Sequence, residues 1–207
     1  MNANVRSEES GLPSGPSGTP GVGRTAGEGD GPDGPPPRAD IRRLGPEEVR
    51  GQAADGLAGL LVDAVEGGAS LGFLRPLEAS EAAAWWEAAA GEREVWAAYD
   101  ARGHVLGAVT LVRETKENGR HRGEIAKLAV HRAARGQGLA RRLLAAAEAH
   151  AAALGLRLLV LDTETGSPAE HLYRATGWTA AGTVPDFAAD PSGTLRPTTL
   201  YYKRLPA

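Results

Sequence analysis

The sequence predicts an α/β fold, with a mixed but mostly antiparallel sheet of about seven strands and about four helices. Three observations predict it. Short alternating segments follow one another in the middle of the chain, a glycine-bearing turn then leads into a long amphipathic helix, and a continuous apolar segment comes after that helix. Short connections favour antiparallel pairing, whereas a helical crossover joins parallel strands.

Residues 1–38 differ in composition from the rest of the chain. They are rich in Gly, Pro, Ser and acidic residues and contain almost no apolar side chains. Such a segment cannot bury enough surface to offset the entropy of ordering it, so we expect a disordered tail. Binding of a partner by this tail is the alternative. One domain is expected over residues 39–207.

The first part of this domain is predicted to be a short strand followed by two helices. Ile41–Leu44 reads as the strand, Glu47–Glu66 as the first helix and Glu78–Ala90 as the second. The second helix carries Trp85 and Trp86, which are either core residues or part of a ligand pocket.

Three strands and a long helix are predicted next. The strands are Glu94–Tyr99, Val105–Arg113 and His121–Val130, and their short polar turns make them an antiparallel meander. The helix runs from about Gly138 to Leu154. Its apolar side chains recur at steps of three and four and define a single buried face: Leu139, Leu143, Ala147, Ala151 and Leu154.

The C-terminal part is predicted to complete the sheet. Leu156–Leu161 is continuously apolar, as in a strand buried on both faces and parallel to its neighbour. A short helix over Pro168–Ala175 follows, with Ser167 as its N-cap and Glu170 positioned for a capping box. The last two strands, Gly177–Val184 and Thr198–Arg204, are separated by an excursion over residues 185–193.

Composition excludes several classes of function. The formal net charge of −3 argues against a nucleic-acid or membrane-surface protein held by bulk charge. Because there is no cysteine, disulfides, thiol nucleophiles and Cys-ligated zinc are excluded. No apolar run approaches the ~20 residues of a membrane span, and no signal-peptide pattern is present, so a cytoplasmic location is expected. The five histidines lack metal-ligand spacing, and we expect no metal.

The strand that ends at Val130 is followed by a turn with the features of an anion site. This turn comprises Arg135, Gly136, Gln137, Gly138, Leu139 and Ala140. The first amides of a helix lack intrahelical acceptors and lie at the positive end of its dipole, and glycine lets a pyrophosphate approach the backbone. It is neither a P-loop nor a dinucleotide fingerprint. The alternative to an anion site is that Gly136 serves only to start the helix after a loop.

At these residues the sequence resembles the GNAT superfamily of N-acetyltransferases. Arg135, Gly138 and Ala140 occupy the fixed positions of the family's acetyl-CoA pyrophosphate motif, Arg-x-x-Gly-x-Gly/Ala. Within the family, the sequence is similar to the bacterial tabtoxin-resistance type from about residue 41 to residue 205. The segments that carry this similarity are residues 67–73, 161–164 and 196–201. The resemblance implies the GNAT arrangement of the sheet and acetyl-CoA as cosubstrate.

The resemblance also implies how acetyl-CoA would be held. The turn would bind the pyrophosphate, and the pantetheine arm would pair with Leu128, Ala129 and Val130 like an added strand. The backbone amide of Ala129 or Leu128 would polarise the thioester oxygen. Many family members have an asparagine that bonds the pantetheine where this chain has Gly166. That contact either shifts to Ser167 or is absent.

Three side chains match the family's catalytic positions. Glu124 and Asp162 would take a proton from the amine, directly or through a water, and Tyr173 would donate to the CoA thiolate. Each has a structural alternative. Glu124 could be a surface partner of Lys127 or Arg122, Asp162 a turn residue that closes its strand, and Tyr173 a core residue.

The resemblance therefore implies direct acetyl transfer from acetyl-CoA to an amine of a small molecule, and points to an amino-acid-like toxin or antibiotic. Two alternatives stay open: acetylation of a protein or peptide, and a non-catalytic regulator that binds acyl-CoA. Aromatic walls formed by Phe73, Trp85 or Phe187 would favour a small acceptor, whereas an open acidic groove would favour a peptide.

Overall fold

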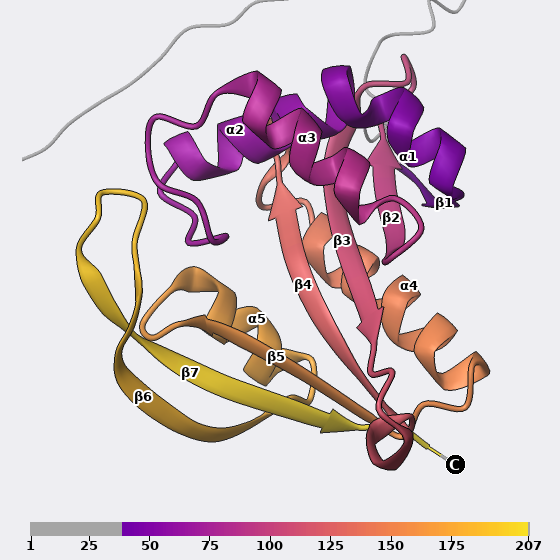
Figure 1. Cartoon of the computed structure of the whole chain (residues 1–207), viewed down its shortest axis with the longest axis vertical. Helices are drawn as coiled ribbons and strands as arrows, with labels where there is room; N and C mark the ends of the chain where they lie inside the picture. The colour runs from indigo at the N-terminus through magenta and orange to yellow at the C-terminus, as the bar shows by residue number, and fades with distance from the viewer. Residues whose placement is uncertain (1–38, 207) are drawn as a thin grey trace, which may run out of the picture. The chain divides into compact units, whose positions relative to one another are not determined.

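The computed structural model describes residues 39–206, so the expected N-terminal tail lies outside the described residues. It shows a mixed seven-stranded sheet in the order β1-β2-β3-β4-β5-β7-β6 (Figure 1). All neighbours are antiparallel except β4 and β5, which are parallel as predicted. The strands are β1 (Asp40–Leu44), β2 (Glu94–Tyr99), β3 (Val105–Arg113), β4 (Arg122–Val130), β5 (Leu158–Glu164), β6 (Thr179–Ala189) and β7 (Leu195–Arg204).

The helices confirm the predicted fold class and add one irregularity. They are α1 (Pro46–Gln52), α2 (Ala58–Glu66), α3 (Ala79–Ala89), α4 (Leu139–Ala153) and α5 (Pro168–Ala175). The predicted helix Glu47–Glu66 corresponds to α1, α2 and a π-helical segment between them, Ala53–Leu57. Short 3₁₀ turns at Glu117–Gly119 and Arg132–Ala134 flank β4.

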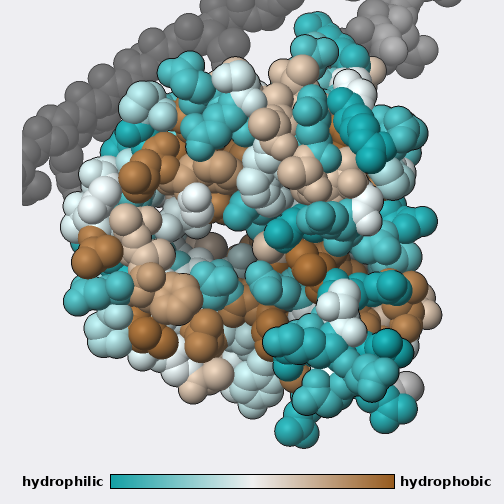
Figure 2. Space-filling model, in the orientation of Figure 1, coloured by the Kyte–Doolittle hydropathy of each residue, from teal (hydrophilic) through white to brown (hydrophobic). Residues whose placement is uncertain are grey.

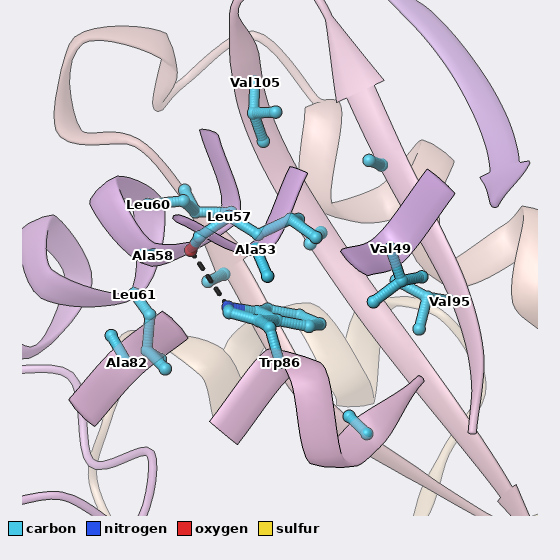
Figure 3. Close-up of a cluster of buried hydrophobic side chains, with 14 of the residues drawn as sticks. Val49, Ala53, Leu57, Ala58, Leu60, Leu61, Ala82, Trp86, Val95 and Val105 are labelled. Atoms are coloured by element: carbon cyan, nitrogen blue, oxygen red, sulfur yellow. Dashed lines mark hydrogen bonds between the residues drawn. The ribbon is translucent and has the colours of Figure 1, made fainter. Parts of the chain in front are cut away.

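Helices cover both faces of the sheet. α1, α2 and α3 pack on one face, around a core that contains Trp86, Leu57 and Val95. Figure 3 shows the Trp86 indole pointing into this core, where its Nε1 donates to the Leu57 carbonyl at 3.0 Å. Trp86 is therefore a core residue, and its polar atom is satisfied by the π-helical segment. α4 and α5 pack on the opposite face, around Leu143.

The pairing of β4 with β5 is short, and as a result the two strands separate within the sheet. Only residues 122–124 of β4 pair with β5, and the last pair is Glu124 with Val160. Figure 1 shows the two strands close together at one end and well separated at the other. The rest of β4 stays paired with β3. The sheet therefore opens in its middle, immediately after Glu124.

Two predictions about the C-terminal part were wrong in detail. β5 runs from Leu158 to Glu164, so Asp162 lies inside the strand, paired with Leu200, and is not a turn residue. The predicted excursion over 185–193 is mostly strand, because β6 continues to Ala189 and β7 begins at Leu195. A bulge after Val184 absorbs the extra residues.

Within residues 39–206, none of the helices has both the length and the apolar character needed to cross a lipid bilayer.

Candidate active site

The glycine turn before α4 presents a row of backbone amides. Gly136 and Gly138 have left-handed backbones, with φ of 77° and 71°, and Gly138 is the N-cap of α4 without a side-chain cap. Among residues 39–206, the next amide after Arg135 to find a protein acceptor is that of Arg142, which donates to the Gly138 carbonyl at 3.2 Å. The amides of residues 136–141, including Gln137, Leu139 and Ala140, are thus left for a ligand. Their position at the positive end of the dipole suits an anion.

Arginines near this turn are anchored by protein contacts. The Arg135 Nε donates to the Val130 carbonyl at 3.2 Å, which holds the turn against the end of β4. Arg132 donates to Asp63 of α2 from its backbone amide at 2.9 Å and from its Nε at 2.8 Å. Burial alone would raise the pKa of Asp63, but the hydrogen bonds from Arg132 bring it below its ordinary value. Arg132 therefore links α2 to the turn and does not simply face solvent or phosphate.

The free edge of β4 lies beside this turn. Ala129 and Val130 pair with β3, Leu128 lies in an irregularity just before them, and none of the three has a β5 partner. An extended ligand can add to such an edge as a strand does. Figure 2 shows the surface hollowed between the two separating strands. The turn and the predicted pantetheine edge therefore form one continuous path into the middle of the sheet.

Glu124 and Asp162 lie on the same side of this opening. Ile125 packs into the core under α4, so Glu124, its neighbour along the strand, faces the other side of the sheet. Asp162 alternates with the buried Leu161 in the same way. Both carboxylates line one surface pocket of about 660 Å³, together with Val160. Neither forms an ion pair or hydrogen bond among residues 39–206. The structure thus brings the two predicted bases together.

The alternative role for Glu124 as a partner of Arg122 is wrong. Arg122 instead donates to Glu114 at 2.6 Å. Lys127 is close enough to influence Glu124 electrostatically, but the two form no salt bridge. Glu124 therefore remains available in the pocket.

Tyr173 of α5 is buried in an aromatic cluster. Its ring centroid lies 5.8 Å from that of Tyr201 and 6.0 Å from that of Trp178. Burial raises the pKa of Tyr173 far above its ordinary value, and the charge of Asp162 raises it further. The phenol therefore stays protonated at neutral pH and can donate a hydrogen bond or a proton. Its burial also fits the alternative of a core residue.

The predicted capping box at α5 does not form. Ser167 is the N-cap but makes no side-chain cap, and its Oγ lies 3.3 Å from the Thr163 Oγ1. The Glu170 carboxylate instead accepts from the Gly166 amide at 3.0 Å and from the Tyr201 hydroxyl at 2.9 Å. Glu170 is buried because this network holds it inward. Ser167 is half-buried beside the strand that carries Asp162, so its predicted contact with a ligand stays a prediction.

Phe73 and Trp85, two of the aromatic residues expected near a pocket, form a wall with cationic residues that the sequence did not reveal. The rings of Phe73 and Trp85 meet edge to face, with centroids 6.3 Å apart. The Lys127 Nζ lies 5.0 Å from the Trp85 ring centroid, and the Arg93 Cζ lies 5.3 Å from it. Trp85 is partly buried and packs against the core as well as belonging to this wall, whereas its neighbour Trp86 is fully buried. A lysine within the apolar segment 125–130 was the only signal in the sequence that could have indicated this cluster.

No group of three or more His, Cys, Asp and Glu side chains among residues 39–206 is arranged to hold a metal ion. Phe187, the third aromatic residue expected near a pocket, is largely exposed on β6.

The chain matches the model of a known protein family. The model of the acetyltransferase (GNAT) family matches residues 59–178, which include the turn, β4, Asp162 and Tyr173. These residues make up more than half of the chain.

Solved structures with the same fold include enzymes with different acceptors. A phosphinothricin acetyltransferase from Sinorhizobium meliloti, in complex with acetyl-CoA, has a TM-score of 0.67 and 21% identity over 81% of this chain and 89% of that one. YncA of Salmonella typhimurium is described as an acetyltransferase and was solved with its cofactor acetyl-CoA. It has a TM-score of 0.66 and 22% identity over 82% of this chain and 95% of that one. A ribosomal-protein-alanine N-acetyltransferase from Brucella melitensis has a TM-score of 0.64 and 24% identity over 80% of this chain and 99% of that one. At these identities the likeness shows the fold.

Proposed function

Because the chain belongs to the acetyltransferase (GNAT) family, we propose that it transfers the acetyl group of acetyl-CoA directly to an amine of a small molecule. One observation carries this proposal: the unpaired amides at the start of α4 lie beside an unpaired edge of β4. Such a combination fits a ligand that has a pyrophosphate at one end and an extended amide-containing arm at the other.

The described residues fit acetyl-CoA in three respects. Residues 136–141 would hold the pyrophosphate through backbone amides, helped by the charge of Arg135. The edge at Leu128, Ala129 and Val130 would pair with the pantetheine, and an amide of Leu128 or Ala129 would stabilise the developing oxyanion. When bound, acetyl-CoA supplies an activated acetyl group as a thioester.

Glu124 and Asp162 would prepare the acceptor. A primary amine is mostly protonated at pH 7 and must lose a proton before it can attack a carbonyl carbon. Two carboxylates that line one pocket and have no partner can bind the ammonium form and accept its proton, directly or through one water. The protonated Tyr173 would donate a proton or a hydrogen bond to the thiolate that leaves.

The composition favours direct transfer. The chain has no cysteine that could carry the acetyl group as an enzyme thioester. In direct transfer the amine and the acetyl group would meet in one ternary complex, which the opening between β4 and β5 could hold.

A small acceptor is favoured by the aromatic wall. The rings of Phe73 and Trp85 meet edge to face, and their centroids lie 5.6 and 5.0 Å from the Nζ of Lys127 on β4. Aromatic side chains are typical of pockets that enclose a small molecule. The similarity of residues 67–73, 161–164 and 196–201 to the tabtoxin-resistance type supports an amino-acid-like toxin or antibiotic as the acceptor, with a cytoplasmic role in detoxification.

Release of free CoA, detected through its thiol, tests the proposal. The purified protein would be incubated with acetyl-CoA and amino-acid analogues, tabtoxinine-type lactams, aminoglycosides, polyamines, and lysine and N-terminal peptides. We expect strong turnover with one amino-acid-like amine. Turnover with peptides alone would instead establish a protein acetyltransferase. Acetyl-CoA binding with no acetylated product from any amine would contradict the proposal and favour a regulator.

A further inference from the structure

We propose that the acceptor carries a negatively charged group near its amine, and that the ammonium of Lys127 binds this group. This inference rests on the proposed function and narrows its acceptor to one chemical class: amines that bear a carboxylate or another oxyanion. It is carried by the backbone position of Lys127, by the surroundings of its ammonium, and by the charges around it.

The backbone at Lys127 is unusual. β4 has one residue more than β3 between the pairs Ala108–Ala129 and Thr110–Ala126, so the ladder contains a bulge at residues 127 and 128. Lys127 has a φ of 50°, which non-glycine residues seldom adopt. Bulges re-aim side chains and are frequent beside active sites. Here the bulge brings the lysine side chain to the aromatic wall, on the face that also carries Glu124.

The ammonium of Lys127 is half-buried without an anionic partner. Its Nζ lies 5.0 Å from the centroid of the Trp85 ring and 5.6 Å from that of Phe73. A Cβ on Gly72 would lie only 3.5 Å from it, so the loop before α3 also approaches closely. Among residues 39–206 it forms no hydrogen bond and no salt bridge. Aromatic rings stabilise a cation, but they do not satisfy the three N–H donors of an ammonium as oxygens would.

Charges of both signs lie near Lys127. The Arg93 guanidinium lies against the same Trp85 ring and has no ion pair among the described residues. Burial lowers the pKa of Lys127 and Arg93 lowers it further, although Asp162 and Glu124 act in the opposite direction. The charged lysine is therefore under-stabilised, and an anion would relieve this. An acceptor with an ammonium and a carboxylate would complement both kinds of charge, with Glu124 and Asp162 facing the amine.

A purely structural role makes a different prediction. If Lys127 only fastened the loop before α3 to the sheet through its aromatic contacts, its replacement would change stability and affect all acceptors alike. If it binds an anion, replacement would selectively affect acceptors that carry one. The two roles can therefore be separated by comparing amines that differ only in a carboxylate.

Three matched pairs serve as probes: L-phenylalanine and phenethylamine, L-methionine and 3-(methylthio)propylamine, and L-lysine and cadaverine. Binding is measured by calorimetry, with and without CoA, and transfer by thiol release. In the wild type we expect the carboxylate member of at least one pair to bind about tenfold or more tightly than its partner, as befits a hydrogen bond to a charged group. Lys127→Met keeps the length and the apolar stem but removes the charge, and should reduce this preference at least about tenfold, mainly through KM.

Two controls accompany this comparison. Lys127→Arg keeps a positive charge and should retain part of the preference, while Lys116→Gln removes a lysine from the exposed turn before β4 and should retain all of it. Thermal unfolding of each variant checks the fold. The inference is overturned if the wild type binds both members of all three pairs with equal affinity. It is also overturned if Lys127→Met weakens binding of both members of a pair by the same factor. Failure of acetyl-CoA to bind, or of transfer to every amine, would overturn the proposed function instead.

Discussion

Glu124 and Asp162 differ from other acidic residues nearby because, within residues 39–206, neither forms a salt bridge or a hydrogen bond. Glu114 pairs with Arg122, and Glu170 is held by Tyr201 and Gly166. A carboxylate that already accepts several hydrogen bonds is a poor base, whereas one that lines a pocket without a partner can take a proton. This contrast singles out the two carboxylates that the family resemblance had indicated.

Asp162→Asn and Glu124→Gln should each lower turnover and alter its dependence on pH. Removal of the residue that acts as the base should reduce kcat by about 10²-fold or more, because an amide cannot accept the proton. Acetyl-CoA affinity should change little, since neither side chain belongs to the turn. Steady-state kinetics and calorimetry measure the two effects, with Glu117→Gln as an exposed control. Wild-type rates in both variants would show that the base lies elsewhere.

Glu170 illustrates a buried carboxylate that serves the fold. Burial alone would raise its pKa, but the hydrogen bonds from the Gly166 amide and the Tyr201 hydroxyl bring it below its ordinary value of 4.5. A depressed pKa in the folded state means that this stabilisation is complete above about pH 4.5 and is lost as pH falls through the lower, folded-state value.

Glu170→Ala should therefore lower the free energy of unfolding by about 1–3 kcal/mol at pH 7, because it leaves the buried Tyr201 hydroxyl without its acceptor. The difference from wild type should shrink below pH 4.5. Denaturant unfolding at several pH values measures this. A difference that does not depend on pH would mean that lost packing, and not the charge, accounts for the effect.

Among the structural elements, the first helical region contains two glycines, Gly56 and Gly59, that differ in the space available for a side chain. A Cβ on Gly56 would lie 2.5 Å from the Val105 Cγ2, whereas a Cβ on Gly59 would meet nothing within 4 Å. Gly56 therefore permits the π-helical segment to lie against β3. Gly59 lies on the exposed side of α2, where its lack of a side chain serves no packing contact. Its main effect is to increase the conformational entropy of the unfolded chain.

Alanine at these two glycines should act in opposite directions. Gly59→Ala should raise the free energy of unfolding by about 0.5–1 kcal/mol. Gly56→Ala should lower it by about 1–3 kcal/mol through overpacking against Val105. Paired denaturant titrations measure both, and each variant serves as the other's control. Stabilisation by both would contradict the close packing described here.

The turn before α4 gives the element-scale test of ligand binding. Gly138→Val places a β-branched residue at a φ of 71° and a side chain where the ligand would approach. We expect acetyl-CoA affinity to fall by about 100-fold or more, since the direction of the amides and the space beside them are both lost. Calorimetry measures the affinity, and circular dichroism shows whether the fold is kept.

Gly155→Val is the matched control for this change. Gly155 follows the other end of α4, has a φ of 78° and has no neighbour that its Cβ would meet. It should suffer comparable backbone strain without loss of affinity. If Gly138→Val bound acetyl-CoA normally, the turn would not be the phosphate site.

How well the sequence predicted each element depends on how strongly the element is patterned. α4 and β2–β4 have clear periodicity and a buried face, and they were predicted to within a residue or two. β6 is exposed along its whole length, apart from Ala189, so no hydrophobic alternation marks it. Pro185 and Asp186 also read as loop residues, although they lie in the bulge of a long hairpin.

The candidate site was predictable where a motif defines it and not where the fold assembles it. Gly136, Gly138 and Asp162 stand in recognisable local patterns. Lys127 and Arg93 become neighbours because both lie against the Trp85 ring of α3, to which a bulge in β4 brings the lysine. Neither the bulge nor the contact across the chain has a signature in local spacing.

At the scale of the whole molecule, the short pairing of β4 with β5 determines what the protein can bind. A fully paired parallel sheet would bury this edge, whereas three paired residues leave the rest of β4 open beside the first turn of α4. Lys127, which lies against the Trp85 ring, is also within electrostatic reach of Glu124 and Asp162. In the proposed function, this arrangement would place the acetyl donor and the acceptor within reach of each other.

Amide hydrogen exchange, followed residue by residue by NMR with and without acetyl-CoA, tests whether the turn before α4 and the open edge of β4 bind this cosubstrate. If they do, acetyl-CoA should slow exchange in residues 136–141 and along residues 128–130, and should leave exchange at the tip of the β6–β7 hairpin unchanged. Protection confined to other segments, or no protection in either of these two, would contradict it.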